Sequence, residues 1–236
     1  MRVPTSASVQ VIHEEAGWLA CAKPAGVCVH DAVEGADDSL AALLRGMLGA
    51  DVHPVHRLDR ETSGCVLFAK SSGSAAELQR CLRAPSTAKR YLAVLRGRLG
   101  EASGTWAQPM SARAGGRSNP LGRRAERVRA STAFEVLSRS PHLSLVELRL
   151  VETGRCHQIR KHAAFNRHAV IGDARYADPR HNRLVREKLG FPLMALHALE
   201  LELTVGGQRR RLRAEVPESW KPLRAAFGDE WAVDRC

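Results

Sequence analysis

The sequence lacks a long apolar run. None of its stretches approaches the roughly 18 consecutive apolar residues that span a bilayer, and Met1 to Gln10 do not contain the apolar segment of a secretory signal peptide. We therefore expect a cytoplasmic protein with no membrane partner.

Metal-binding patterns are missing as well. The six cysteines include no Cys-x-x-Cys pair, which excludes a zinc ribbon and a thioredoxin-type redox motif. Among the histidines, His53 and His56 have no second pair, and His157 and His162 lie five residues apart rather than four. We expect no metal, and we expect most cysteines to be reduced core residues.

Common cofactor and hydrolase motifs are also absent. The sequence contains neither the phosphate and dinucleotide loops GxxxxGK[ST] and GxGxxG nor the hydrolase motifs HExxH and GxSxG. These absences disfavour nucleotide hydrolysis, dinucleotide redox chemistry and zinc hydrolysis. We expect no cofactor.

Positive charge, by contrast, is abundant. Lys and Arg number 36 against 25 Asp and Glu, so the formal net charge is +11. With 44% hydrophobic and 26% charged residues, the composition is that of a folded globular protein rather than a disordered chain. The excess favours a polyanionic partner, nucleic acid first, although a solvated cationic surface without function would have the same composition.

Six arginines gather in residues 111–129, which contain a single glutamate, several Gly and Pro residues and no apolar periodicity. A long loop of this kind inside a domain is commonly functional or disordered. Its charge suits it to phosphate contacts, and we expect Arg123 and Arg124 to make them. A merely solvated loop is the alternative.

Hydrophobic periodicity predicts both strands and helices. Apolar residues alternate with polar ones in 199–205 and 211–216, as in half-buried antiparallel strands. Ser39 is a suitable cap for a helix over 40–48. Further strands are expected at Val9–His13, Trp18–Ala22, Val27–His30, Cys65–Ala69, Lys89–Arg96, Ser131–Leu137 and Leu143–Val151, and further helices at Ser74–Arg83, His157–Phe165 and Asn182–Leu189. This mixed order predicts an α+β fold, with an extended, mostly antiparallel sheet flanked by helices and loops, in a single domain 1–236.

The densest polar segment is HRLDRETSG, residues 56–64, directly before an apolar strand. Asp59 lies between Arg57 and Arg60, whose positive charges would keep its carboxylate ionised. Thr62 and the residues after it offer turn geometry and hydroxyl donors. An ordinary Asx turn with surface ion pairs explains the pattern equally well, so a catalytic carboxylate and a structural turn both stay open at this point.

Residues 56–64 resemble the signature of the RluA-type pseudouridine synthases, which convert uridine to pseudouridine in structured RNA. Five more blocks follow the family's order: KPAG with Val29-His30 in 23–30, KRYLAV in 89–94, TGRCHQIRKH in 153–162, Gly172-Asp173 with Tyr176, and Leu196-His197-Ala198. The resemblance covers roughly residues 9–216. It implies the pseudouridine synthase catalytic fold, a cofactor-free isomerase acting on RNA, and a catalytic domain without the S4-type RNA-binding domain of many relatives.

The resemblance implies catalytic roles for three residues. Asp59 matches the essential aspartate, which either attacks C1′ of the ribose or takes a proton from C2′ when the bond between N1 and C1′ breaks. Tyr91 matches a tyrosine whose ring stacks on the uracil and whose phenol lies near the C5 proton. Arg160 matches the arginine that grips the aspartate through two hydrogen bonds and keeps its pKa low.

The same resemblance implies substrate-binding residues. Arg57 is the candidate side chain that fills the stack when the uridine is flipped out of folded RNA. Leu196 is expected to form an apolar wall of the uracil pocket. His56 and Thr62 belong to the signature around Asp59, and we expect them to bind the substrate as well.

Two departures from the family pattern concern loops. The family often has Gly-His-Pro after the block 153–162 and Tyr-Gly in the block that begins at Gly172, whereas this chain has Arg167-His168-Ala169 and Tyr176-Ala177. We therefore expect a different loop shape, and a different RNA contact, at these two places.

The resemblance leaves the RNA substrate open. The basic segment 178–183 and the absence of an S4 domain are similar to the branch that modifies transfer RNA, which we favour, while 23S ribosomal RNA is the alternative substrate. A non-catalytic RNA-binding or ribosome-assembly module is a more remote hypothesis, because Asp59, Tyr91 and Arg160 are all present. An RNA methyltransferase would need a glycine-rich cofactor loop, which is missing. We expect a monomer.

Overall fold

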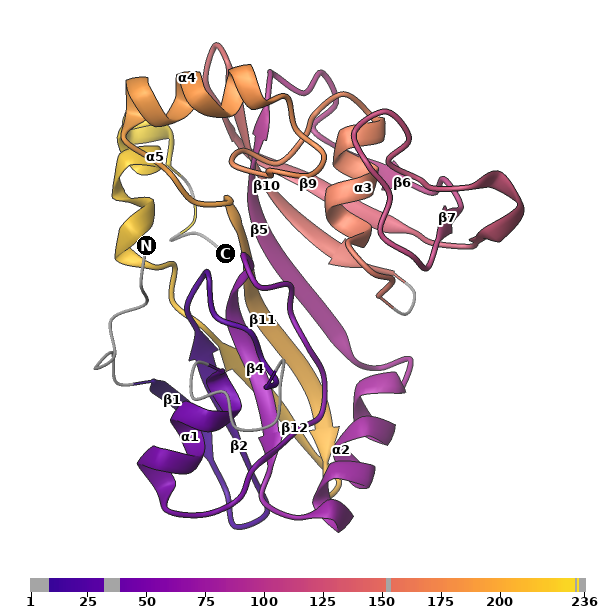
Figure 1. The fold of residues 1–236 in the computed structure, drawn as a ribbon, viewed down its shortest axis with the longest axis vertical. Helices are drawn as coiled ribbons and strands as arrows, with labels where there is room; N and C mark the ends of the chain where they lie inside the picture. The colour runs from indigo at the N-terminus through magenta and orange to yellow at the C-terminus, as the bar shows by residue number, and fades with distance from the viewer. Residues whose placement is uncertain (1–8, 32–38, 152–153, 232, 234–236) are drawn as a thin grey trace. The chain divides into compact units, whose positions relative to one another are not determined.

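The computed structural model describes residues 9–31, 39–151, 154–231 and 233 (Figure 1). The chain divides into two compact units: unit 1 comprises residues 1–89 and 197–217, and unit 2 comprises residues 90–196 and 218–236. Thr153, the first residue of one of the sequence blocks, lies outside the described residues. Each unit combines β-strands with α-helices.

Unit 1 is a sheet with flanking helices. Its elements are β1 (Gln10–Glu14), β2 (Trp18–Lys23), α1 (Leu40–Leu48), β3 (His53–Pro54), β4 (Ser63–Ala69), α2 (Ser72–Arg83), β11 (Leu196–Val205) and β12 (Gln208–Arg213). The strand β4 pairs antiparallel with β2 and β3, and its first residues pair parallel with β11. β1 pairs with β2, and β12 pairs with β11, both antiparallel.

Strand β4 is buried along its whole length. Every second side chain, Cys65, Leu67 and Ala69, packs into one apolar cluster with residues of α2 and β11, as expected for one face of a strand. Gly64 has a φ of +119°, and a Cβ atom there would lie 2.2 Å from the carbonyl oxygen of Ala198. Glycine is therefore required where β4 meets β11, and the polar segment 56–62 leads directly into this rigid strand.

Unit 2 contains the remaining elements. They are β5 (Ala88–Arg96), β6 (Ser103–Trp106), β7 (Met110–Ser111), the 3-10 turn η1 (Arg124–Glu126), β8 (Arg127–Val128), β9 (Thr132–Arg139), β10 (Leu143–Leu150), α3 (Gln158–Phe165), α4 (Pro179–Leu189), η2 (Glu218–Trp220), α5 (Lys221–Ala225) and η3 (Gly228–Glu230). β10 pairs antiparallel with β5 and with β9, and β9 pairs antiparallel with β6.

Helix α3 is fixed to this sheet on two sides of Arg160. Ile159 and Ala163 join the apolar cluster formed by β5, β9 and β10. Two polar side chains of the helix reach Thr132 of β9: Gln158 Nε2 donates to its Oγ1 (3.2 Å), and His162 Nδ1 lies 2.8 Å from the same oxygen. The backbone that carries Arg160 is therefore held by packing and by hydrogen bonds.

The α+β fold class with mostly antiparallel strands and flanking helices is confirmed. Two predicted elements need correction. Val27–His30 is not a strand, because Cys28 forms only an isolated bridge with Ser39. Helix α4 begins at Pro179 rather than at Asn182, since Asp178 caps it by accepting a hydrogen bond from the backbone N–H of Arg180 (2.9 Å). The single-domain boundary 1–236 stays a prediction.

Residues 111–129, which we call the arginine arm, consist mostly of turns and irregular backbone, as the sequence predicts, with a short strand at each end. The short strands β7 and β8 pair antiparallel, and η1 precedes β8. Met110, Leu121 and Ala130 form a small apolar cluster of their own. This cluster escapes a periodicity search because its members lie far apart in the sequence. Within the described residues, no helix has the length and apolar character needed to cross a membrane.

Candidate active site

The loop that carries Asp59 is clamped by the turn Lys23–Gly26. The carbonyl oxygen of Arg60, the next residue, accepts hydrogen bonds from the backbone N–H of Gly26 (2.9 Å) and from Lys23 Nζ (2.9 Å). Arg60 Nε donates in return to the carbonyl oxygen of Gly26 (2.9 Å). A turn hydrogen bond from Thr62 N to the carbonyl oxygen of Asp59 (3.0 Å) closes the loop. The backbone on the carboxyl side of Asp59 is thus fixed.

Lys23 is a buried ammonium group whose side chain is almost inaccessible to solvent. Besides Arg60, Nζ donates to the carbonyl oxygens of Pro24 (2.9 Å) and Val27 (2.8 Å). Burial lowers the pKa of Lys23 to about 8, although the negative charges of Glu61 and Asp59 partly oppose the shift. Three carbonyl oxygens therefore accept hydrogen bonds from the ammonium group in place of water.

The other signature residues of unit 1 surround Asp59 in the sequence and differ in exposure. His56 Nε2 accepts the backbone N–H of Leu67 (3.0 Å), and burial lowers the pKa of His56 to about 3. The imidazole is therefore neutral and carries its proton on Nδ1. Arg57 is exposed, Asp59 is half-buried, and Thr62 is buried with no hydrogen-bond partner for Oγ1 within the described part of the chain.

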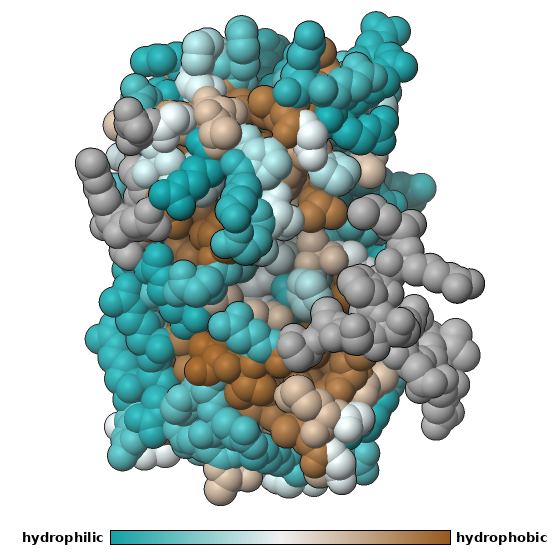
Figure 2. All heavy atoms as spheres, turned by 90° about the vertical axis from the view of Figure 1, so that its left-hand side faces the viewer, coloured by the Kyte–Doolittle hydropathy of each residue, from teal (hydrophilic) through white to brown (hydrophobic). Residues whose placement is uncertain are grey.

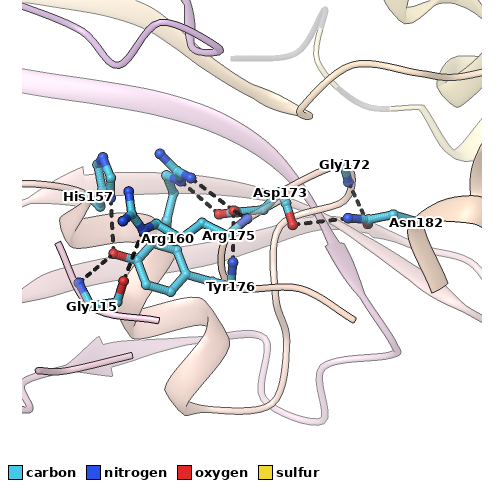
Figure 3. Close-up of polar contacts among 8 residues, drawn as sticks. All are labelled: Gly115, His157, Arg160, Gly172, Asp173, Arg175, Tyr176 and Asn182. Atoms are coloured by element: carbon cyan, nitrogen blue, oxygen red, sulfur yellow. Dashed lines mark hydrogen bonds and ion pairs between the residues drawn. The ribbon is translucent and has the colours of Figure 1, made fainter. Parts of the chain in front are cut away.

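Arg160 forms a buried two-point ion pair with Asp173. Its Nε lies 2.7 Å from Oδ2, and its Nη2 lies 2.9 Å from Oδ1 (Figure 3). Asp173 is fully buried, and its Oδ1 also accepts the backbone N–H groups of Arg175 (2.8 Å) and Tyr176 (3.0 Å). The carboxylate therefore fixes the guanidinium and the turn that follows it. The expected contact between Arg160 and Asp59 stays a prediction.

Tyr176 connects this ion pair to the arginine arm. Its ring lies beside the guanidinium of Arg160, with 5.3 Å from Cζ to the ring centroid. Its hydroxyl accepts the backbone N–H of Gly115 (3.2 Å) and lies 3.0 Å from Nδ1 of His157 (Figure 3). Burial raises the pKa of Tyr176 to about 12, so the phenol keeps its proton and donates it toward His157. Arg175 Nε adds a bond to the carbonyl oxygen of Gly115 (3.0 Å).

The arginine arm has a second attachment to α3. Lys161, the neighbour of Arg160, is buried, and its Nζ donates to the carbonyl oxygens of Ser111 (2.7 Å) and Arg113 (2.8 Å). The arm's arginines do not all face solvent freely, because Arg127 donates from Nε and Nη2 to the carbonyl oxygen of Gly122. Arg123 and Arg124 are exposed.

Tyr91 and Leu196 share one apolar cluster in unit 2. Leu196 is buried in it, and Tyr91 is half-buried against it, together with Ile159 of α3. Tyr91 and Leu196 therefore lie at the apolar core against which α3, the helix that carries Arg160, packs. Across the described ranges, no group of three or more His, Cys, Asp or Glu side chains is arranged to hold a metal ion.

Comparison with known proteins decides the family. A model described as RNA pseudouridylate synthase matches residues 17–165. The chain belongs to the RNA pseudouridylate synthase family. The prediction of a pseudouridine synthase of the RluA type, and with it of an isomerase, is therefore confirmed.

Relatives and solved structures agree with this family. The chain is 30% identical to tRNA pseudouridine synthase C of Vibrio vulnificus, over 94% of this chain and 96% of that protein. It is 33% identical to the protein of the same name from Yersinia pestis, over 93% of this chain and 91% of that one. The structure of human RNA Pseudouridylate Synthase Domain Containing 1 matches the fold with a TM-score of 0.76, at 24% identity, over 96% of this chain and 91% of that one.

Two residues of this pseudouridylate synthase have structural roles that the sequence did not assign. Asp173 stands in one of the family's sequence blocks, Gly172-Asp173, yet its partner Arg160 lies in another block, and nothing in the spacing joins them. Lys23 stands at the end of an apolar strand directly before a Pro-Ala-Gly turn. Its Nζ caps three backbone carbonyl oxygens, one of which belongs to the distant residue Arg60.

Proposed function

We propose that this chain converts a uridine of transfer RNA to pseudouridine, with Asp59 as the catalytic carboxylate. The observation that carries the proposal is the similarity, over 94% of the chain, to a protein named tRNA pseudouridine synthase C. The structure adds a fixed loop for the carboxylate. Catalysis by positioning requires such fixed backbones, because a displacement of about 1 Å can cost a hundredfold in rate.

The proposed reaction rearranges one nucleotide without adding or removing atoms. The bond between N1 and C1′ breaks, the uracil rotates while it stays bound, and a new bond forms between C5 and C1′. The proton on C5 leaves, and N1 gains one. Asp59 assists the first step either by attacking C1′, which forms a covalent ester that later breaks, or by removing a proton from C2′ and returning it.

Tyr91, Arg160 and Leu196 complete the proposed catalytic group. Tyr91 stacks on the uracil and brings its phenol near the C5 proton. Arg160 keeps Asp59 ionised and oriented, and its buried pair with Asp173 supports this role because a guanidinium already held on one edge turns the remaining N–H groups in a fixed direction. Leu196 forms an apolar wall for the base.

The remaining site residues bind the RNA in this proposal. Arg57 is exposed, as a side chain that enters the base stack must be. Thr62 offers a hydroxyl that has no partner within the described ranges, and His56 offers the ring edge opposite its occupied Nε2. Arg123 and Arg124 on the arginine arm contact phosphates. We further propose a cytoplasmic monomer that needs neither metal nor cofactor.

Tritium release tests the reaction directly. Transfer RNA and ribosomal RNA carrying tritium at C5 of uridine are offered separately to the wild-type chain and to Asp59→Asn. We expect release from transfer RNA by the wild type and none by the variant, which keeps the shape of the side chain and loses its charge. RNA binding by Asp59→Asn should stay within a few fold of the wild type.

Each other result changes the proposal in a defined way. Release from ribosomal RNA alone would replace the substrate by the alternative one. Binding of RNA without release from either RNA or from ribosome-assembly precursors would leave a non-catalytic RNA-binding module. Release by Asp59→Asn would remove Asp59 from the catalytic role.

A further inference from the structure

Helix α4 carries a group of basic residues without acidic partners. Its residues include Arg180, Arg183, Arg186 and Lys188, and Glu187 is its only acid. All four basic side chains are exposed. In the described part of the chain, none of the four takes part in an ion pair. In Figure 2, many hydrophilic residues, with some hydrophobic ones between them, lie at the upper end of the view, where Figure 1 draws α4.

This charge makes α4 costly to form. Arginines three residues apart lie on the same side of a helix, and like charges at this spacing destabilise it. Apolar packing contributes little, because Val185 is the one buried residue of the helix. A helix that buries so little apolar surface gains stability from ion pairs or from a partner. An anion bound to Arg180 and Arg183 would remove the repulsion between them.

The helix nevertheless has a fixed position in unit 2. Asp178 caps its start, and Gly190 ends it in the left-handed conformation. The side chain of Asn182 bridges two backbone groups: Oδ1 accepts the N–H of Gly172 (3.0 Å), and Nδ2 donates to the carbonyl oxygen of Asp173 (3.0 Å) (Figure 3). Asp173 is the residue that holds Arg160, so α4 is attached to the same short segment as the guanidinium.

We propose that the exposed face of α4, with Arg180 and Arg183 at its centre, is a docking surface for the phosphate backbone of the RNA substrate. The proposal rests on the proposed function and adds a second phosphate contact to that of the arginine arm. Guanidinium groups fit phosphate oxygens through paired hydrogen bonds, and free arginines gain most from such a partner. The attachment through Asn182 places this contact at a fixed position relative to Arg160 within unit 2.

Helix α2 offers a matched control. Arg80 and Arg83 have the same spacing as Arg180 and Arg183, are exposed, and form no ion pair with any residue that the structure describes. Unlike α4, α2 buries Leu78 and Leu82, so apolar packing stabilises it. Replacing either pair by glutamine removes the same charge from an exposed helix surface.

The experiment measures transfer RNA binding by the full chain over a range of salt concentrations. Arg180→Gln with Arg183→Gln is compared with Arg80→Gln with Arg83→Gln and with the wild type. We expect the α4 variant to bind about tenfold more weakly at low salt and to lose about 1.5 units of the slope of log K against log salt, because two phosphate contacts are removed. The α2 variant should stay within twofold of the wild type. Thermal unfolding checks that both variants are folded.

Equal weakening in both variants would show a general effect of net charge, and it would overturn the docking surface. Unchanged binding in the α4 variant would also overturn the docking surface. The basic face of α4 would then bind an acidic protein or only be hydrated. Tritium release by the wild type decides the proposed function separately. If no RNA releases tritium but the α4 variant alone weakens RNA binding, the proposed function fails and the docking surface stands.

Discussion

Arginine is used in opposite ways in strand β12 of unit 1 and in the arginine arm of unit 2. In unit 1, the arginines of β12 face acids: Arg209 pairs with Glu202 (2.5 Å), Arg210 with Glu15 (2.8 Å) and Arg211 with Glu200 (2.6 Å). In unit 2, Arg117, Arg123, Arg124 and Arg129 of the arginine arm are exposed, and no acid among the described residues pairs with them. The basic residues of α4 are likewise exposed and without an ion pair among the described residues.

The difference shows where a net charge of +11 can act. A paired arginine is already neutralised at short range and contributes to the fold, whereas a free one is available to an anion. The number of arginines in the arginine arm overstates how many are available to an anion, because Arg127 is bound to the carbonyl oxygen of Gly122. We therefore expect losses of the paired arginines of β12 to lower stability, and losses of the free arginines of the arginine arm and of α4 to lower RNA affinity.

The strongest test of this comparison concerns the buried pair of Arg160 with Asp173. Asp173→Asn removes the buried carboxylate charge that holds the guanidinium of Arg160 on two atoms, and breaking such a pair costs about 3–5 kcal/mol. Because Arg160 would also lose its fixed orientation, we expect kcat to fall by about a hundredfold. Urea unfolding measures the first effect, and tritium release under saturating transfer RNA measures the second.

The control for this variant is Asp51→Asn, which makes the same chemical change at an exposed position. It should leave stability and kcat as in the wild type. A stable Asp173→Asn with wild-type turnover would mean that the pair neither supports the fold nor positions Arg160. Lost stability with unchanged kcat would restrict Asp173 to a structural role.

A smaller effect is expected from the free arginines of the arm. Arg123→Ala with Arg124→Ala should weaken RNA binding across different RNAs and flatten its salt dependence by about 1.5 units, with no change in unfolding free energy. The matched variant, Arg45→Ala with Arg209→Ala, removes two arginines that pair with Asp31 and Glu202. It should lower stability slightly and leave the salt slope unchanged. An unchanged slope in the arm variant would make the arm a bystander.

Elements that depend on local pattern were predictable from the sequence. The amphipathic helix α2 is visible in periodicity because it buries one face, and β4 is visible as a short apolar run because it is buried on both faces. The alternation of apolar and polar residues in 199–205 indicates β11. The signature around Asp59 was readable because it precedes a core strand. Cys28 shows the limit of this approach: its neighbours look like a strand, yet only one bridge forms, since pairing depends on a partner that the local sequence does not contain.

The parts that could not be predicted are side-chain partners from distant segments. Asp173 meets Arg160 because a turn brings its carboxylate to α3, and Lys161 meets the backbone of the arginine arm for the same kind of reason. A buried lysine inside a polar helix carries no sequence signal that separates it from an exposed one. Such choices are decided by the cost of leaving a buried charge without a partner, which only the folded chain reveals.

The smallest effect on activity is expected from a change at Tyr176, whose hydroxyl connects the arginine arm to the residues around Arg160. Tyr176→Phe keeps the ring beside Arg160 and removes only the hydroxyl, which takes the hydrogen bond from Gly115 and the contact with His157. A neutral hydrogen bond contributes about 1 kcal/mol, and Lys161 still holds the base of the arm, so KM for transfer RNA should rise only a few fold while kcat stays unchanged. Tyr91→Phe, the same change in the other tyrosine, should instead lower kcat, because the proposed reaction uses that phenol. A fall in kcat with Tyr176→Phe would place the hydroxyl in the chemistry itself, and an unchanged KM would show that the arm does not depend on it.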